Sequence, residues 1–396
     1  MKRNINILYD LQLSALDSLE DGRFLFTPDS NVNVATFTVN GLLEKNPNWH
    51  VYLLVPPKEK TAGGLIFPSE LSDRVTKIEY DYFGNPFMDR MTFLPRSLPK
   101  NIDIVYTNDP CKVLAYKTYY YYALKKIIPV ICRNHWVTGK TDRKVPEQID
   151  FITRQVEGVI KGDWMTFNSL FAANIFLENA SEFFSEETVS SLVDKMACFE
   201  TVDVKKVDRH RTTKRLCDEF LILWAHRLSY YTGWEKTFVA LLQVWEKRKD
   251  FRVLIPDPGN KFTQKELKER YPFMLEIDKK SWTHEKYLEA CWASDIVLGN
   301  HQYPATWGGL AITEPMAACT VPIMPNRWAY NEMYWMNAKN IFFEDEKEMV
   351  ELVEHYIDLP KEILDKKKER SRKFCLERLS MKKYISTIED KINELA

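Results

Sequence analysis

Short, continuous apolar runs alternate along the chain with longer segments in which apolar residues recur at helical spacing. Runs of this kind are typical of parallel strands that helices cover on both faces. They fall at residues 5–9, 50–55, 102–107 and 128–133, and again at 220–225, 251–255, 296–299 and 321–324. The helical spacing is clearest at residues 32–45, 112–126, 234–248, 283–293 and 313–318. The pattern therefore predicts an α/β protein.

The strands and helices form two series, which predict two doubly wound, Rossmann-like domains. A chain of 396 residues is also too long for one ordinary core. Residues 201–214 are polar, charged and short of large apolar side chains, so we expect the link between the domains there. We expect an N-terminal domain at residues 1–205, a C-terminal domain at 206–370, and a C-terminal helix at 371–396 that packs back on the N-terminal domain.

Composition limits the classes of protein. The formal net charge is −1, which argues against a purely electrostatic nucleic-acid binder but not against an enzyme with a local basic groove. The seven cysteines include no C-x-x-C pair, which argues against a structural zinc site and a disulfide framework. The first residues do not form a signal peptide, and no apolar run reaches the roughly 18 residues of a spanning helix. These features favour a soluble, cytoplasmic protein.

Candidate chemistry lies after the strands of the second half, because open α/β sheets bind ligands at the carboxyl ends of their strands. Arg227 follows one predicted strand, and its guanidinium suits phosphate oxygens. The N–H groups of Gly309 and Leu310, at a predicted helix start, would add an anion site. Glu314, further along that helix, could accept from two neighbouring ribose hydroxyls. In this order the residues indicate a site for a nucleoside diphosphate.

The same segments resemble a known family. FLILWAHRL, FRVLIPDPGN and SDIVLGNHQYPATWGGLAITEPMAACTVPIMPNRWAYNE resemble the donor domain of retaining glycosyltransferases of family 4. In the first half, IPVICRNHWVTG resembles the family strand that ends in a histidine beside the donor sugar, and GDWMTFNSLFAANIF resembles the strand and helix start that follow. The resemblance implies the GT-B fold, in which two Rossmann-like domains face a central cleft.

The resemblance also implies roles for individual residues. Glu314 falls on the glutamate that the family uses on the ribose, and the backbone of Gly309 and Leu310 faces the diphosphate. The expected nucleotide-sugar site is completed by Asp257, Gly259, Thr306 and Gly308. The candidates for the catalytic role are His135, Arg227 and Lys236.

Two positions depart from the family pattern. Thr306 stands where the family has the first glutamate of its Glu-x7-Glu segment, so the contacts to the sugar cannot be carried over. The family lysine that follows the strand-end arginine is also displaced, because Lys236 lies nine residues after Arg227 and Thr232 holds the usual place. Either a longer loop delivers Lys236 to the pyrophosphate, or hydroxyl groups replace its charge. Lys236 would otherwise be a solvated lysine of a first helical turn.

The family chemistry implies transfer of a glycosyl group from a nucleoside diphosphate sugar, with a UDP-sugar as the preferred donor, and retention at the anomeric carbon. Arg227 and the helix-start amides would stabilise the negative charge that grows on the departing diphosphate. The sequence has no Asp-x-Asp metal motif, in keeping with metal-independent catalysis. No cofactor besides the donor is implied.

The acceptor is expected at the strand ends of the first half, on Asn108, Asp109, Arg133 and Trp136. The preferred hypothesis is a hydroxylated base in DNA or RNA. LILWAHR and SDIVLGNHQY weakly resemble a glycosyltransferase that modifies the queuosine base of transfer RNA. The pattern R…TGWEK resembles phage enzymes that glucosylate hydroxymethylated DNA bases and likewise lack the first glutamate.

A basic groove with stacking surfaces would serve such an acceptor. The Tyr119–Tyr122 run and Trp136 could supply the stacking surface. The candidate basic residues are Arg90, Arg96, Lys100, Lys112, Lys125, Lys126, Lys140, Arg143 and Lys144. Charged loops and helix faces are more often simply solvated. Three alternatives stay open: transfer to a lipid-linked or cell-surface glycan, a non-catalytic binding protein on a degenerate GT-B scaffold, and a nucleotide-sugar epimerase of the same architecture.

Overall fold

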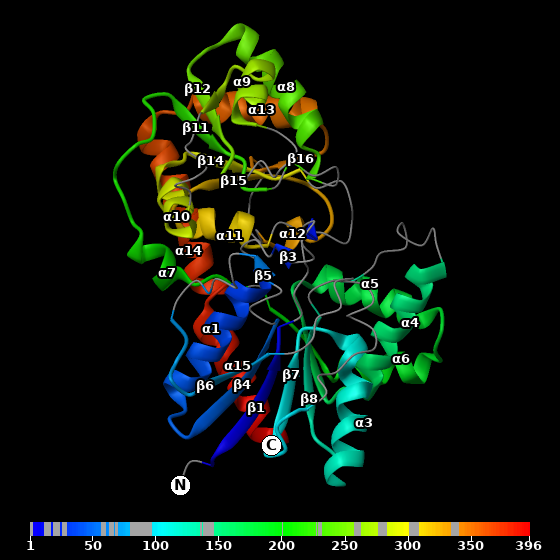
Figure 1. Ribbon diagram of the computed structural model, residues 1–396. Helices are drawn as coiled ribbons and strands as arrows, with labels where there is room; N and C mark the ends of the chain where they lie inside the picture. The colour runs from blue at the N-terminus through cyan, green and yellow to red at the C-terminus, as the bar shows by residue number, and fades with distance from the viewer. Residues whose placement is uncertain are drawn as a thin grey trace. The chain divides into compact units, whose positions relative to one another are not determined.

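The structure is a computed structural model of the 396-residue chain. It describes residues 3–11, 17–18, 24–25, 30–56, 61–62, 67, 70–79, 97–134, 137, 146–199, 201–226, 228, 232–256, 263–275, 283–300, 309–333 and 340–396. The chain forms two compact units, unit 1 at Met1–Phe199 with Lys382–Ala396 and unit 2 at Glu200–Met381. Each unit has its own parallel sheet and its own helices (Figure 1).

Unit 1 is built on a seven-stranded sheet with the order β10-β9-β8-β7-β1-β4-β6, in which all neighbours are parallel. Its strands are β1 (Ile5–Asp10), β4 (Trp49–Val55), β6 (Val75–Glu79), β7 (Ile104–Thr107), β8 (Val130–Asn134), β9 (Trp164–Phe167) and β10 (Met196–Cys198). The residues of β7, β8 and β9 are all buried, which explains why these strands read as continuous runs rather than alternating ones.

The helices of unit 1 are α1 (Ser30–Lys45), the 3-10 helix η2 (Pro110–Lys112), α3 (Val113–Leu124), α4 (Pro146–Lys161), α5 (Leu170–Ser181), α6 (Glu186–Val193) and α15 (Met381–Leu395). The side chains of Ser169 and Ser185 cap α5 and α6, each accepting from a backbone N–H three residues on. A small separate sheet pairs β2 (Asp17–Ser18), β3 (Phe24–Leu25) and β5 (Thr61–Ala62).

The last helix, α15, belongs to unit 1 although unit 2 precedes it in the chain. Its buried face is formed by Tyr384, Ile385, Ile388 and Ile392, at the three- and four-residue spacing of an amphipathic helix. Ile385 packs on Gly41 of α1 so closely that a Cβ at Gly41 would collide with it. Glu389 accepts from Lys45 Nζ at 3.0 Å and from Asn46 Nδ2 at 3.0 Å. These contacts hold α15 against α1.

Unit 2 has a six-stranded parallel sheet with the order β13-β12-β11-β14-β15-β16. Its strands are β11 (Phe220–Leu223), β12 (Phe251–Leu254), β13 (Met274–Leu275), β14 (Ile296–Leu298), β15 (Val321–Pro325) and β16 (Phe342–Phe343). Its helices are α7 (Val204–Arg209), α8 (Trp234–Lys247), α9 (Gln264–Arg270), α10 (His284–Ala293), α11 (Leu310–Ala317), α12 (Tyr330–Met333), α13 (Glu346–Ile357) and α14 (Lys361–Arg378).

The two sheets confirm the predicted α/β, doubly wound architecture. The expected domain borders lie after residues 205 and 370, whereas the compact units meet after Phe199 and after Met381. The expectation of a polar linker at residues 201–214 is wrong for its first part. There α7 begins at Val204, and Val202 and Val207 are buried in the core of unit 2. The few apolar residues of this segment lie among many charged ones, so they do not form a recognisable helical pattern in the sequence.

None of the described helices has both the length and the apolar character needed to cross a membrane.

Candidate functional site

The start of α11 lies in the connection that leads on from β14, one of the central strands of unit 2. Gly309 caps this helix with φ 45° and ψ −141°, and the positive φ favours glycine over residues with a side chain. The Gly309 carbonyl accepts from the backbone N–H groups of Ile312 and Thr313, each at 3.1 Å. Leu310 is the first residue of α11, where the backbone N–H groups find no acceptor inside the helix. The helix start can therefore receive an anion.

Glu314 lies in the second turn of α11 and is buried. Its Oε1 lies 3.2 Å from Nε2 of His284, the first residue of α10. Lys206 of α7 is also buried, and burial lowers the pKa of its ammonium while the Glu314 carboxylate acts in the opposite direction. Glu314 is thus a buried carboxylate that is oriented by His284 and interacts electrostatically with Lys206.

A ladder of hydrogen bonds joins two strand ends to the start of α8. Arg327, after β15, donates from Nη2 to Oδ1 of Asn300, after β14, at 2.9 Å. Asn300 Nδ2 donates to Thr237 Oγ1 at 2.9 Å, and that hydroxyl donates to the Gly233 carbonyl at 3.0 Å. Burial lowers the pKa of the Arg327 guanidinium, and the ring of Trp328 lies 4.8 Å from it. The ladder places a cation and an amide at the carboxyl edge of the sheet.

The sequence analysis assigned no specific role to His284, Asn300 or Arg327. Asn300 and Arg327 follow predicted strands, and that position was the available signal. His284 carried none, because its relation to Glu314 spans 30 residues and depends on how α10 packs beside α11.

Lys236 lies in the first turn of α8 and is exposed. No ion pair to it occurs among the residues that the structure describes. Gly233 caps the helix with φ 67°. Thr232, at the usual place of the family lysine, is buried. The structure therefore places Lys236 on the solvated face of α8.

Seven of the predicted site residues lie outside the described part of the chain. They are His135, Trp136, Arg227, Asp257, Gly259, Thr306 and Gly308. Their roles stay predictions.

In unit 1, the expected acceptor residues hold the strand ends together. Asn108 donates from Nδ2 to the Leu11 carbonyl at 3.0 Å, and its backbone N–H donates to the Asp10 carbonyl at 3.1 Å. Asp109 caps η2 by accepting from the Cys111 N–H at 3.0 Å. Arg133, the penultimate residue of β8, is buried and donates to Asn168 Oδ1 at 3.0 Å. The three residues share one edge of the sheet.

The suggested basic groove is wrong at two points. Lys112 is not a surface residue, because it is buried in an ion pair with Asp10 at 3.1 Å, and the Tyr116 hydroxyl donates to the same carboxylate at 2.6 Å. The exposed rings of Tyr121 and Tyr122 lie at the end of α3, where the chain turns back towards the start of β8. A helix between two parallel strands runs from the carboxyl edge of the sheet to its amino edge. These rings are therefore at the opposite edge from Arg133.

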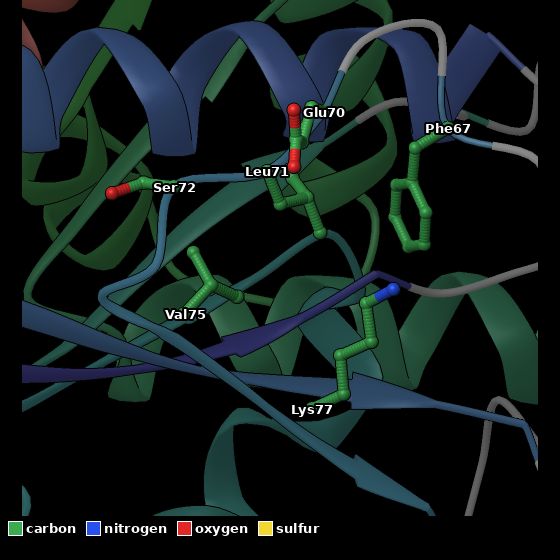
Figure 2. Close-up of a pocket in the computed structure, with 6 residues that line it drawn as sticks. All are labelled: Phe67, Glu70, Leu71, Ser72, Val75 and Lys77. Atoms are coloured by element: carbon green, nitrogen blue, oxygen red, sulfur yellow. The ribbon is translucent and has the colours of Figure 1, made fainter.

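A surface hollow of about 490 Å³ lies in unit 1, beside edge strand β6, and Figure 2 shows the side chains that line it. Its lining consists of Phe67, Glu70, Leu71, Ser72, Val75 and Lys77. The Lys77 ammonium lies 4.6 Å from the centre of the Phe67 ring. None of the predicted site residues lines this hollow. Among the described residues, no cluster of His, Cys, Asp and Glu has the arrangement needed to hold a metal ion.

No known protein-family profile matches the sequence. Among curated proteins, the tRNA-queuosine alpha-mannosyltransferase of Drosophila melanogaster is 22% identical over 261 residues, which cover 61% of this chain and 67% of that protein.

Similar solved structures cover the whole chain. A glycosyltransferase from Rickettsia africae superposes with a TM-score of 0.67 at 17% identity, over 100% of both chains. HepE from Anabaena in complex with UDP-glucose superposes with a TM-score of 0.61 at 12% identity, over 98% of both chains. At these identities the likeness shows the fold, and the fold is that of the GT-B glycosyltransferases. The sequence prediction of this fold is confirmed.

Proposed function

We propose that the protein is a retaining, metal-independent glycosyltransferase that moves a sugar from a UDP-sugar to a hydroxylated base in nucleic acid. The observation that carries the donor half of this proposal is the buried Glu314 carboxylate at the start of α11, oriented by His284 at 3.2 Å. A buried carboxylate beside a helix start that can receive an anion suits a ribose joined to a diphosphate. HepE, which shares the fold, binds UDP-glucose.

The proposed chemistry needs stabilisation of the departing diphosphate. The N–H groups at the start of α11, which have no acceptor within the helix, would face the phosphate oxygens, and Arg227 would add a forked cation. Lys236 would need to reach the diphosphate from the solvated face of α8. Arg327 offers a second cation at the same edge of the sheet, already held by Asn300. His135 would lie beside the sugar, as the resemblance to family 4 implies. Retention also rests on that resemblance.

The remaining donor contacts would come from residues outside the described part of the chain. Asp257, Gly259, Thr306 and Gly308 would complete the nucleotide-sugar site, with the hydroxyl of Thr306 in place of the family carboxylate.

The nucleic-acid acceptor is supported by the similarity to the queuosine alpha-mannosyltransferase. On unit 1, Asn108, Asp109, Arg133 and Trp136 would receive it. A hydroxylated base would have to leave its stack to reach a sugar donor, as bases do in other base-modifying enzymes.

Hydrolysis of the donor tests the site. In a UDP-sugar hydrolysis assay, Glu314→Gln should raise the KM for the donor about 10- to 100-fold, because charged hydrogen bonds of this kind contribute about 1.5–3 kcal/mol. Glu289→Gln, at an exposed position of α10, is the matched control and should leave KM unchanged. Equal kinetics in both variants would remove Glu314 from the site.

A second assay tests the acceptor. Labelled sugar from UDP-sugar should pass to transfer RNA or to DNA that carries 5-hydroxymethylated bases, and nuclease digestion should release it as a modified nucleoside. The anomeric coupling of that nucleoside in an NMR spectrum should match the configuration of the donor. Transfer to a lipid extract but to neither nucleic acid would contradict the proposed acceptor.

A further inference from the structure

Arg133 carries a buried guanidinium. Only 7% of the residue is exposed. Its Nη2 donates to Asn168 Oδ1 at 3.0 Å, while its Nη1 is fully enclosed and has no hydrogen-bond partner among the residues that the structure describes. In the described ranges of the chain, no carboxylate lies within ion-pair distance of it. Arginine does not lose its proton in proteins, so the charge persists.

Two neighbouring phenols do not supply a negative charge either. Tyr9 and Tyr106 lie close enough to feel the charge of Arg133, but burial raises the pKa of both phenols well above its usual value, so both stay neutral. Thr166, the residue opposite Arg133 in β9, has a buried hydroxyl that also lacks a partner in the described part of the chain. Three polar groups thus converge at the carboxyl edge of β8 and β9: a guanidinium, a hydroxyl and the Asn168 amide.

The neighbouring helix makes the local charge more positive. Asn168 precedes Ser169, the cap of α5, and α5 is a helix of 12 residues whose positive end lies at this strand edge. A buried charge without a partner is expensive, and native structures pair such charges or place them against a ligand. The arrangement therefore favours a bound anion.

We propose that Arg133, Thr166 and Asn168, beside the positive end of α5, form an anion subsite that holds a phosphate ester of the acceptor. A tetrahedral phosphate has enough oxygens to accept from the guanidinium and from the hydroxyl at once. The assignment of the phosphate to the acceptor rests on the proposed function, since a nucleic acid carries a phosphodiester beside every base. The anion subsite itself rests on the geometry of unit 1.

Thermal unfolding of the full chain in rising inorganic phosphate, against chloride at equal ionic strength, tests the subsite. Phosphate should raise the unfolding midpoint of the wild type by several degrees, by mass action on the folded state. Arg133→Met removes the charge at similar length. It should abolish this shift and should raise the midpoint without phosphate, because it removes a buried unpaired charge. Arg3→Met, at an exposed position, should change neither value.

A purely structural role for Arg133 predicts the opposite results for Arg133→Met. If Arg133 only holds Asn168 in place, Arg133→Met lowers the midpoint without phosphate and keeps the phosphate shift, which would overturn the proposal. Thr166→Val serves if Arg133→Met does not fold, since it keeps shape and removes only the hydroxyl. It should weaken phosphate binding about 3- to 10-fold, as expected for the loss of one hydrogen bond. No phosphate shift in the wild type, or an undiminished shift in Thr166→Val, would also overturn it.

Two phosphate esters distinguish whether the phosphate bound at the subsite belongs to a nucleic acid or to a small molecule. A short RNA should compete with inorganic phosphate, and Arg133→Met should weaken its binding and make that binding less steeply dependent on salt. A shift with glucose 6-phosphate and none with RNA would keep the subsite but reject nucleic acid as the acceptor. The failure of the proposed function is thereby separable from the failure of the subsite.

Discussion

At the scale of single residues, the contact between His284 and Glu314 determines how the carboxylate of the proposed donor site is held. The 3.2 Å approach of His284 Nε2 to Glu314 Oε1 keeps the carboxylate in one orientation before a ligand arrives. We expect His284→Ala to raise the KM for the UDP-sugar about 10-fold and to leave kcat within about 2-fold, because preorganisation is lost while the reacting groups are untouched.

Steady-state kinetics across donor concentrations measure this split. His284→Gln, which can still donate to Glu314, should recover most of the loss. His355→Ala, on the exposed face of α13, is the control. A fall in kcat with unchanged KM would show that His284 does not act through donor binding.

His226, after β11, gives unit 2 a dependence on pH. Burial lowers the pKa of this imidazole from 6.5 to about 4, and its ring packs 5.7 Å from that of Trp224. Between these pH values the unfolded chain binds a proton that the folded chain does not. Stability therefore falls as the pH drops through this window, by about 3 kcal/mol in total.

Replacing the imidazole should remove this part of the pH dependence. In denaturant titrations between pH 4 and 7, His226→Gln should give a flatter curve of unfolding free energy against pH than the wild type. His355→Gln, at its exposed position, should keep the wild-type slope. An unchanged slope in His226→Gln would mean that other groups cause the acid sensitivity.

At the scale of elements, the approach of α4 to η2 depends on one glycine. A Cβ at Gly158 would collide with the main-chain oxygen of Pro110. Alanine in an open helix position stabilises by up to about 1 kcal/mol over glycine, but overpacking costs about 1–3 kcal/mol. Gly158→Ala should therefore lower the unfolding free energy of unit 1, as measured by denaturant titration. Glu157→Ala, next to it on the exposed face, should not.

Most elements were predictable because the strands are buried on both faces and read as apolar runs. The errors occur where short segments depend on distant partners. The expected C-terminal helix at residues 371–396 is two helices, because α14 ends at Arg378 and α15 begins at Met381. The break is fixed by Val202, whose N–H donates to the Leu379 carbonyl at 3.0 Å, and a local pattern cannot show that contact.

The residues of the candidate site also divide into those that a local sequence pattern reveals and those that depend on distant contacts. Glu314 and Gly309 were predictable because they lie in one helix and its cap, where spacing along the chain carries the information. The place of Asn300 and Arg327 after predicted strands was predictable, but the hydrogen bond between them was not. His284 was not predictable, because it meets Glu314 only after α10 and α11 have packed together. Lys112 was misjudged for a related reason. A lysine reads as a surface charge until the carboxylate of Asp10, about a hundred residues earlier, is placed beside it.

At the scale of the whole molecule, the chain visits unit 1, then unit 2, and returns to unit 1 with α15. Each unit has its own sheet and core, so each can respond separately to a ligand. The proposed donor residues that the structure describes, Glu314, Gly309 and Leu310, all belong to unit 2. The proposed anion subsite belongs to unit 1. The two halves of the proposed reaction are therefore predicted to stabilise different units.

This separation is measurable by hydrogen exchange of the full chain with UDP and, in parallel, with inorganic phosphate. A ligand at about 100 times its Kd stabilises the state that binds it by about 2.7 kcal/mol, which slows exchange through global opening of that unit about 100-fold. UDP should protect the core strands β11 and β14 of unit 2 and leave β7 and β8 of unit 1 unchanged. Phosphate should protect β8 and β9. Glu314→Gln should remove the first effect and Arg133→Met the second. Protection of both units by UDP in the Glu314→Gln variant would contradict the assignment of the donor to unit 2, because the stabilisation would then arise from contacts that this carboxylate does not make.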